Sequence, residues 1–190
     1  MKVTIAICCL TAALLSQRSA AAEPADHTAA AQAAIAAFGG ALKAELTSAM
    51  QTGGPLNAIE VCNSRAPAIA QAVSLDSGMQ LSRVSLRNRN PANAPNEWQA
   101  DVLQDFETRQ ATGEPVDALA WQEVTEIGGQ QEFRLMKAIP TIALCLACHG
   151  EAIAPPLADK IAELYPADQA TGFREGDIRG AFVVTKKLNP

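Results

Sequence analysis

The amino-acid sequence predicts an α+β fold, with a helical N-terminal part and a small antiparallel sheet of about four strands flanked by further helices. Between Ile35 and Met50, apolar side chains recur every three or four residues, which is typical of an amphipathic helix. Later in the chain, two alternating segments separated by Gly128-Gly129-Gln130 have the pattern of a β-hairpin. The predicted strands are residues 81–86, 121–127, 131–139 and 178–188.

The composition is that of one globular domain. The chain has 190 residues, of which 48% are hydrophobic and 18% are charged, and this balance argues against a largely disordered chain. The formal net charge is −5, and the basic residues are scattered among acidic ones. Because no basic stripe is present to neutralise phosphates, nucleic acid is not expected as a partner.

The first 22 residues have the three parts of a cleaved export signal. Lys2 gives a positive start, residues 3–15 form an almost unbroken apolar run, and Ala20-Ala21-Ala22 offers the small residues that signal peptidase recognises. The run is shorter than the roughly 20 apolar residues that a membrane span needs. We therefore expect a periplasmic protein without a membrane span in its mature chain, built as a single domain over residues 23–190.

Three helices are expected before the first strand. Asp26 can cap a helix that ends at Gly53-Gly54, because glycine is favoured just after helix C-termini. Pro55 then suits the first turn of a second helix, and Pro67 suits the first turn of a third.

The chain then changes to strands, loops and short helices. On the strand 81–86 and its continuation, Arg83, Ser85 and Arg87 are expected on one face, since side chains alternate along a strand. An Asn- and Pro-rich loop follows, and Asn96 can cap the next helix. Further helices are predicted over residues 97–112, 142–148 and 156–164.

The cysteines divide into two groups. Cys8 and Cys9 lie inside the apolar run of the signal, whereas a lipid-attachment cysteine of a lipoprotein lies at its end, so they are expected to leave with the signal. Cys62, Cys145 and Cys148 remain, and an odd number of cysteines cannot all pair in intramolecular disulfides. At least one sulfur therefore needs another partner.

Cys145-Leu146-Ala147-Cys148-His149 has the CxxCH pattern of covalent haem attachment. Two thiols at this spacing can add to the two vinyl groups of haem, and the adjacent imidazole can then bind the iron from one side. Cys145 and Cys148 would form the thioethers of a single haem c, and His149 would be the proximal iron ligand. Export supports this interpretation, because bacteria attach c-type haem outside the cytoplasm.

Three other interpretations of the motif remain open. Cys62, Cys145, Cys148 and His149 could form a Cys₃His zinc site, although the adjacent residues 148 and 149 are awkward ligands for one tetrahedral ion. A thioredoxin-type redox pair should follow the first strand of a βαβ unit, and no such unit is predicted. A disulfide between Cys145 and Cys148 would leave His149 without a role.

The second axial ligand must come from before the motif or be water, because the residues after His149 include neither Met nor His. His27 lies close to the expected cleavage site, where chains are often mobile, and methionines commonly have a packing role. Cys62 differs because it is the unpaired third sulfur of an exported chain. The protein candidates are His27, Met50, Cys62, Met79, Met136 and a lysine.

Three segments, one of which contains the CxxCH motif, resemble a known family. Residues 58–70 contain AIEVC and APAIA, residues 83–98 read RVSLRNRNPANAPNEW, and residues 145–150 carry the haem motif. A weaker fourth match covers residues 165–181. They resemble exported single-haem c-type proteins with a PAS-like domain, which occur alone or as input domains of bacterial sensor kinases. The resemblance implies a PAS-like antiparallel sheet with flanking helices and iron held by His149 and Cys62.

His/Cys ligation has consequences for function. Two protein ligands close both axial positions of the iron, which weighs against an enzyme, and no catalytic residues are expected. Reduction would place an extra negative charge beside the Cys62 thiolate in a buried site, so the reduction potential should be low and the thiolate bond should weaken. CO or NO could then bind the reduced haem.

Two functions are compatible with these expectations. The first is a redox or gas sensor module that acts through an unidentified signalling or redox protein. The alternative is a low-potential electron-transfer protein that keeps both ligands in both states. Arg83, Arg87 and Arg89 are expected to contact the haem propionates, because guanidinium groups suit carboxylates, unless they are simply solvated.

Overall fold

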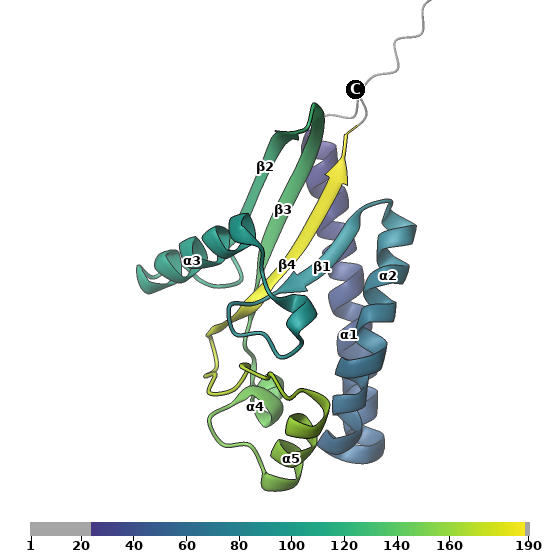
Figure 1. Ribbon diagram of the computed structural model, residues 1–190, viewed down its shortest axis with the longest axis vertical. Coiled ribbons are helices and arrows are strands. Elements are labelled where there is room, and N and C mark those ends of the chain that lie inside the picture. Colours follow the sequence, from purple (N-terminus) through teal and green to yellow (C-terminus); the bar gives the residue numbers. More distant parts are fainter. Residues whose placement is uncertain (1–23, 189–190) are drawn as a thin grey trace, which may run out of the picture.

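The computed structural model describes residues 24–188, and the expected export signal lies outside this range. One sheet of four antiparallel strands runs through the described part, in the order β1-β4-β3-β2 (Figure 1). The α+β prediction is therefore confirmed, and each predicted strand is present with small shifts of its ends. The strands are β1 (Gln80–Val84), β2 (Ala120–Ile127), β3 (Gln130–Pro140) and β4 (Ile178–Lys187).

Helices surround the sheet. Asn96 caps α3 as predicted, because its side chain accepts a hydrogen bond from the backbone N–H of Gln99 while the Gln99 side chain accepts one from the Asn96 N–H. Among the described residues, no helix has the length and apolar character needed to cross a membrane. The helices are α1 (Pro24–Glu60), the π-helix η1 (Val61–Arg65), α2 (Ala66–Ser77), the 3₁₀ turn η2 (Pro91–Asn93), α3 (Glu97–Ala111), α4 (Ala143–His149) and α5 (Pro155–Leu164).

A helical hairpin precedes the sheet. Gly54 interrupts α1 with φ 68° and ψ −166°, a conformation that is essentially restricted to glycine, and Pro55 starts the returning arm. The arms are joined by the Arg65–Glu45 ion pair at 2.7 Å and by the Asn57 side-chain amide, which donates to the Ala49 carbonyl. The break at Gly53-Gly54 is thus where the sequence predicts it.

The returning arm differs from the prediction in one respect. The second and third expected helices form one continuous run, in which α1 passes through η1 into α2 without a loop. Pro67 lies in the first turn of α2, directly after the π-helical turn η1, where the regular α-helical hydrogen-bond pattern is already interrupted. Proline at this position therefore does not require a separate helix.

Helices cover both faces of the sheet. Successive strand residues point to opposite faces, and accordingly Met136 and Val183 pack towards α3, whereas Leu135 and Val184 pack towards α1 and α2. His27 belongs to the second face: it is 8% exposed and its ring centroid lies 5.8 Å from that of Phe133, so its side chain is packed against the sheet although its position near the expected cleavage site suggested a mobile terminus. The α3-side cluster comprises Val84, Val102, Leu103, Phe106, Val116, Leu119, Met136, Ala138, Ala181 and Val183.

The strand register brings three strand ends together. Val84, near the end of β1, pairs with Ala181, and Ile139, near the end of β3, pairs with Gly180 at the start of β4. Gly180 has φ 152°, and a Cβ there would overlap the Val84 carbonyl oxygen. This close approach fixes the edge of the sheet from which the candidate site is built.

Candidate functional site

A cavity of about 330 Å³ opens at this end of the sheet. Its size falls within the range of small-molecule sites, about 300–1,000 Å³. One wall comes from α1 and η1, another from α4, and the floor from the ends of β1, β3 and β4. Most of the wall is apolar, and the polar side chains that line it belong to Lys43, Cys62, Arg83, Ser85, Asn88, Arg89, Asn90, Asn93, Cys145, Cys148, His149, Tyr165 and Arg179.

Cys62 reaches the cavity from the π-helix η1. Single π-helical turns within α-helices occur frequently at functional sites, because the extra residue per turn reorients a side chain. Burial raises the pKa of the Cys62 thiol, while the positive charges of Arg83, Arg89 and Arg179 act in the opposite direction. The thiol is free and half-buried, as are those of Cys145 and Cys148.

His149 ends α4 and is held in one orientation. Its Nδ1 lies 2.7 Å from the Ala170 carbonyl oxygen, which can only accept, so Nδ1 carries the proton. Burial, together with the charges of Arg179 and Arg89, lowers the pKa of His149 to about 2. The ring is therefore neutral, and Nε2, which has no hydrogen-bond partner among residues 24–188, keeps a lone pair for a ligand.

The segment after α5 fastens α4 in place. Phe173 N–H donates to the His149 carbonyl at 2.9 Å, and Gly172 N–H donates to the Gly150 carbonyl at 2.9 Å. The Phe173 ring lies edge-on to the imidazole, with centroids 6.2 Å apart. Backbone and ring contacts thus both restrict the motion of His149.

Arg89 and Asp168 form a buried ion pair beneath this segment. Their side chains are 6% and 9% exposed and are joined at 3.1 Å. Nη2 of Arg89 also donates to the Cys148 carbonyl at 2.6 Å and to the Ala170 carbonyl at 3.2 Å. Asp168 accepts from the Ala170 N–H at 2.8 Å. Arg89 therefore mainly stabilises the backbone conformation around Cys148 and Ala170.

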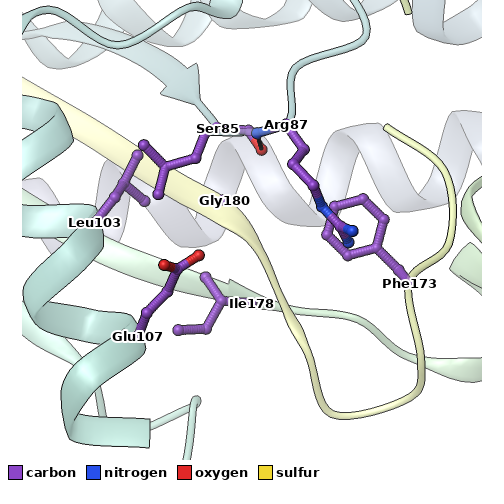
Figure 2. Close-up of a pocket in the computed structure, with 8 residues that line it drawn as sticks. Ser85, Arg87, Leu103, Glu107, Phe173, Ile178 and Gly180 are labelled. Atoms are coloured by element: carbon purple, nitrogen blue, oxygen red, sulfur yellow. Dashed lines mark hydrogen bonds between the residues drawn. The ribbon is translucent and has the colours of Figure 1, made fainter. Parts of the chain in front are cut away.

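The three predicted arginine contacts have different environments. Arg83 and Arg89 line the cavity, but Arg87 does not, contrary to expectation. Strand β1 ends at Val84, so Arg87 does not share a strand face with Arg83. Figure 2 shows the Arg87 guanidinium over the Phe173 ring, with its carbon 3.6 Å from the ring centroid. Arg179 lines the cavity instead.

The other candidate axial ligands are separated by the fold. Met79 and Met136 lie in the two apolar clusters against the sheet, and His27 packs on Phe133. Met50 and Lys43 do line the cavity with Cys62. Within the described residues, no group of three or more His, Cys, Asp or Glu side chains is placed to hold a metal ion, so the four residues of the Cys₃His alternative do not converge.

Three functional positions were not identified from the sequence. Tyr165 and Arg179 line the cavity, and Asp168 holds Arg89. Arg179 carries a usable signal, because it is the charged residue in the mainly apolar first part of β4, residues 178–184. Asp168 carries none, because an aspartate in a loop is ordinarily solvated.

Comparison with known proteins is consistent with this architecture. A search of curated proteins found no match. The crystal structure of the cyanobacterial heme-protein Tll0287 superposes with a TM-score of 0.66 at 25% sequence identity, covering 89% of this chain and 100% of that one. The family profile Tll0287-like matches residues 12–186, which is most of the sequence. The resemblance carried by the three segments is thereby confirmed at the level of the family, and the chain belongs to the Tll0287-like family.

Proposed function

We propose that this chain binds one covalent haem c in the cavity and acts as a periplasmic redox or gas sensor module. The observation that carries the proposal is that four residues from distant segments line a single cavity: Cys62, which precedes β1, and Cys145, Cys148 and His149, which lie between β3 and β4. The similarity to a protein described as a heme-protein supports the same conclusion.

The residues present fit haem better than the alternatives. The cavity walls are mainly apolar, which suits a porphyrin, and its volume is far larger than a zinc ion needs. His149 offers a neutral imidazole with Nε2 free, which is the form that binds iron. The three thiols are free and half-buried, so they are available for attachment or ligation.

Each residue has a proposed role. Cys145 and Cys148 would hold the haem through thioether bonds, and His149, through Nε2, and Cys62 would bind its iron. The Ala170 carbonyl fixes the His149 tautomer, and Arg89 with Asp168 holds that carbonyl in place. Bound haem supplies an iron that exchanges one electron and binds small gases when a ligand position is free.

Covalent attachment is tested by the intact mass of protein secreted from cells that carry a c-type haem maturation system. We expect the mass of the mature chain plus one haem. Cys145→Ser combined with Cys148→Ser should abolish the mass increase, because both thioether positions are then removed. Wild-type protein with the mass of the polypeptide alone contradicts the proposal.

The axial ligands are tested by absorption and EPR spectra of the ferric protein. We expect the low-spin spectrum of thiolate ligation, and Cys62→Ala should remove it while leaving the covalent mass unchanged. Met50→Leu is the matched control, since Met50 lines the same cavity and should leave the spectrum unaltered. A spectrum that changes in Met50→Leu and persists in Cys62→Ala assigns the ligand to Met50 instead.

The sensor and carrier functions differ in the reduced state. In a sensor, Cys62 would be the ligand that becomes free in the reduced state, which would leave room for CO or NO, and the η1 segment that carries it would contact the partner protein. A low-potential electron carrier requires six-coordination in both states. The position of Cys62 on a π-helical turn favours the sensor, because such a turn can convert to a regular α-helix. The ferrous spectrum with and without CO distinguishes the two.

A further inference from the structure

Two arginines in the cavity lack an acidic partner. Most arginines of the described chain pair with a carboxylate, whereas Arg83, Arg87 and Arg179 do not. Arg87 is exposed to solvent and stacks on Phe173, so its charge needs no counterion from the protein. Arg83 and Arg179 remain, and both line the cavity. The paired arginines are Arg65, Arg89, Arg109, Arg134 and Arg174.

The neighbours of these two groups do not neutralise them. Arg179 donates to the Ser85 hydroxyl at 3.3 Å and to the Arg87 carbonyl at 3.4 Å, and both acceptors are uncharged. Arg83 lies over the Phe38 ring, with its guanidinium carbon 5.3 Å from the centroid. The buried carboxylate in this region, that of Asp168, is already bound to Arg89.

Burial makes the missing counterions significant. Burial lowers the pKa of Arg83, and burial together with the charges of Arg89 and Arg83 lowers the pKa of Arg179 to about 10. Guanidinium groups stay protonated in proteins, so both carry a positive charge at neutral pH. Both side chains are half-buried and line the cavity. A charge that is partly removed from water without a directly bonded counterion is unfavourable, so negative groups of a ligand in the cavity would stabilise both arginines.

We propose that Arg83 and Arg179 form an anion subsite that binds two carboxylates, which, on the proposed function above, are the propionates of the haem. The planar guanidinium suits a carboxylate because it can donate two parallel hydrogen bonds. The number of unpaired guanidinium groups equals the number of propionates. This assignment replaces Arg87 with Arg179 and leaves Arg89 to hold Asp168 and the backbone around His149.

The assignment is tested on haem-loaded protein with Arg83→Gln, Arg179→Gln and the double variant. Each loses a positive charge close to the iron, so the reduced and more negative state is less stable. We expect the equilibrium constant for reduction to fall roughly tenfold in each single variant. The loss of one charge near the haem, at an effective dielectric of about 20, changes the free energy of reduction by an amount of this order. The carboxylate bands in the ferric-minus-ferrous infrared difference spectrum should shift as well. Spectroelectrochemistry measures the midpoint potential.

Lys187→Gln is the matched control. Lys187 lies on the same strand, β4, and carries the same charge, but it is exposed at the opposite end of the strand from Arg179. It should leave the potential and the carboxylate bands unchanged. If both arginine variants behave like Lys187→Gln while retaining covalent haem, the anion subsite is wrong and the proposed function stands. If the wild-type chain carries no haem by mass, both are wrong.

A crystal structure of the wild-type haem-loaded protein provides a test that does not depend on the folding of any variant. We expect a propionate oxygen within hydrogen-bond distance of each of the two guanidinium groups. Propionates turned towards solvent, or a free carboxylate anion from the buffer between the arginines, would overturn the assignment.

Discussion

The core between α3 and the sheet and the cavity at the end of the sheet are built from the same three strands, yet they differ in chemistry. The α3-side cluster consists of ten buried apolar residues. The cavity collects three thiols, an imidazole and three guanidinium groups. Ala138 and Ala181 belong to the first, whereas their sequence neighbours Ile139 and Gly180 line the second, and Val84 contributes to both. Adjacent residues of the same strands thus serve stability and the candidate site.

The largest expected difference between the regions comes from Phe106→Ala. Phe106 is fully buried in the α3-side cluster, so its truncation should lower the free energy of unfolding by about 3–5 kcal/mol. The spectrum of bound haem should not change, since Phe106 does not line the cavity. Urea unfolding and the absorption spectrum measure the two effects. An altered spectrum at unchanged stability would contradict the separation of the regions.

Asp168→Ala should affect both properties. It leaves the buried Arg89 without its carboxylate, which is expected to cost about 3 kcal/mol in the free energy of unfolding. It also removes the acceptor of the Ala170 N–H, so the carbonyl that orients His149 should become less fixed and the EPR signal should broaden. Asp105→Ala, at an exposed ion pair, serves as the control and should change neither property appreciably.

Gly180→Ala tests the close approach that defines the cavity edge. The added methyl would overlap the Val84 carbonyl, and the positive φ is unfavourable for alanine, so unfolding should become easier by about 2 kcal/mol. Gly40→Ala, in the middle of α1 with no atom within 4 Å of the new methyl, should instead stabilise the protein by about 0.5–1 kcal/mol. Thermal and urea unfolding compare the pair, and equal effects would argue against a strained Gly180.

Arg87→Ala should have the smallest effect. It removes an exposed cation–π contact with Phe173, worth about 0.5–1 kcal/mol. The midpoint potential should stay close to that of the wild type, because the Arg87 charge is in solvent outside the cavity. A fall in potential as large as that expected for Arg179→Gln would return Arg87 to the anion subsite.

The elements of the fold were predictable where local sequence decides them. The Asn96 cap, the Gly128-Gly129 turn with φ 59° and 79°, and the reversal at Gly54 each follow from the backbone preference of one or two residues. The continuity of the helix through Pro67 was not, because it depends on the π-helical turn η1, which the sequence pattern did not predict.

The candidate site was predictable only in part. CxxCH identifies three residues by spacing alone, and the odd cysteine count identifies Cys62 as exceptional. The choice among arginines depends on where β1 ends and on how residues 165–173 return to α4, which are long-range properties. Both guanidinium groups lie over the Phe173 ring, at 3.6 Å for Arg87 and 5.1 Å for Arg179, but only Arg179 also lines the cavity.

The strand order has a kinetic consequence. Within residues 24–188, β4 is the last strand, yet it lies between β1 and β3, and it is the only described strand that pairs with β1. Gln80 pairs with Thr185, so this contact closes a very long loop, and such contacts form slowly. Arg83 and Arg179 therefore meet only when the C-terminal strand docks. Cys145 and Cys148 lie in the short helix α4, which is synthesised before β4. Their thiols can therefore be modified before β4 docks and brings Arg83 and Arg179 together.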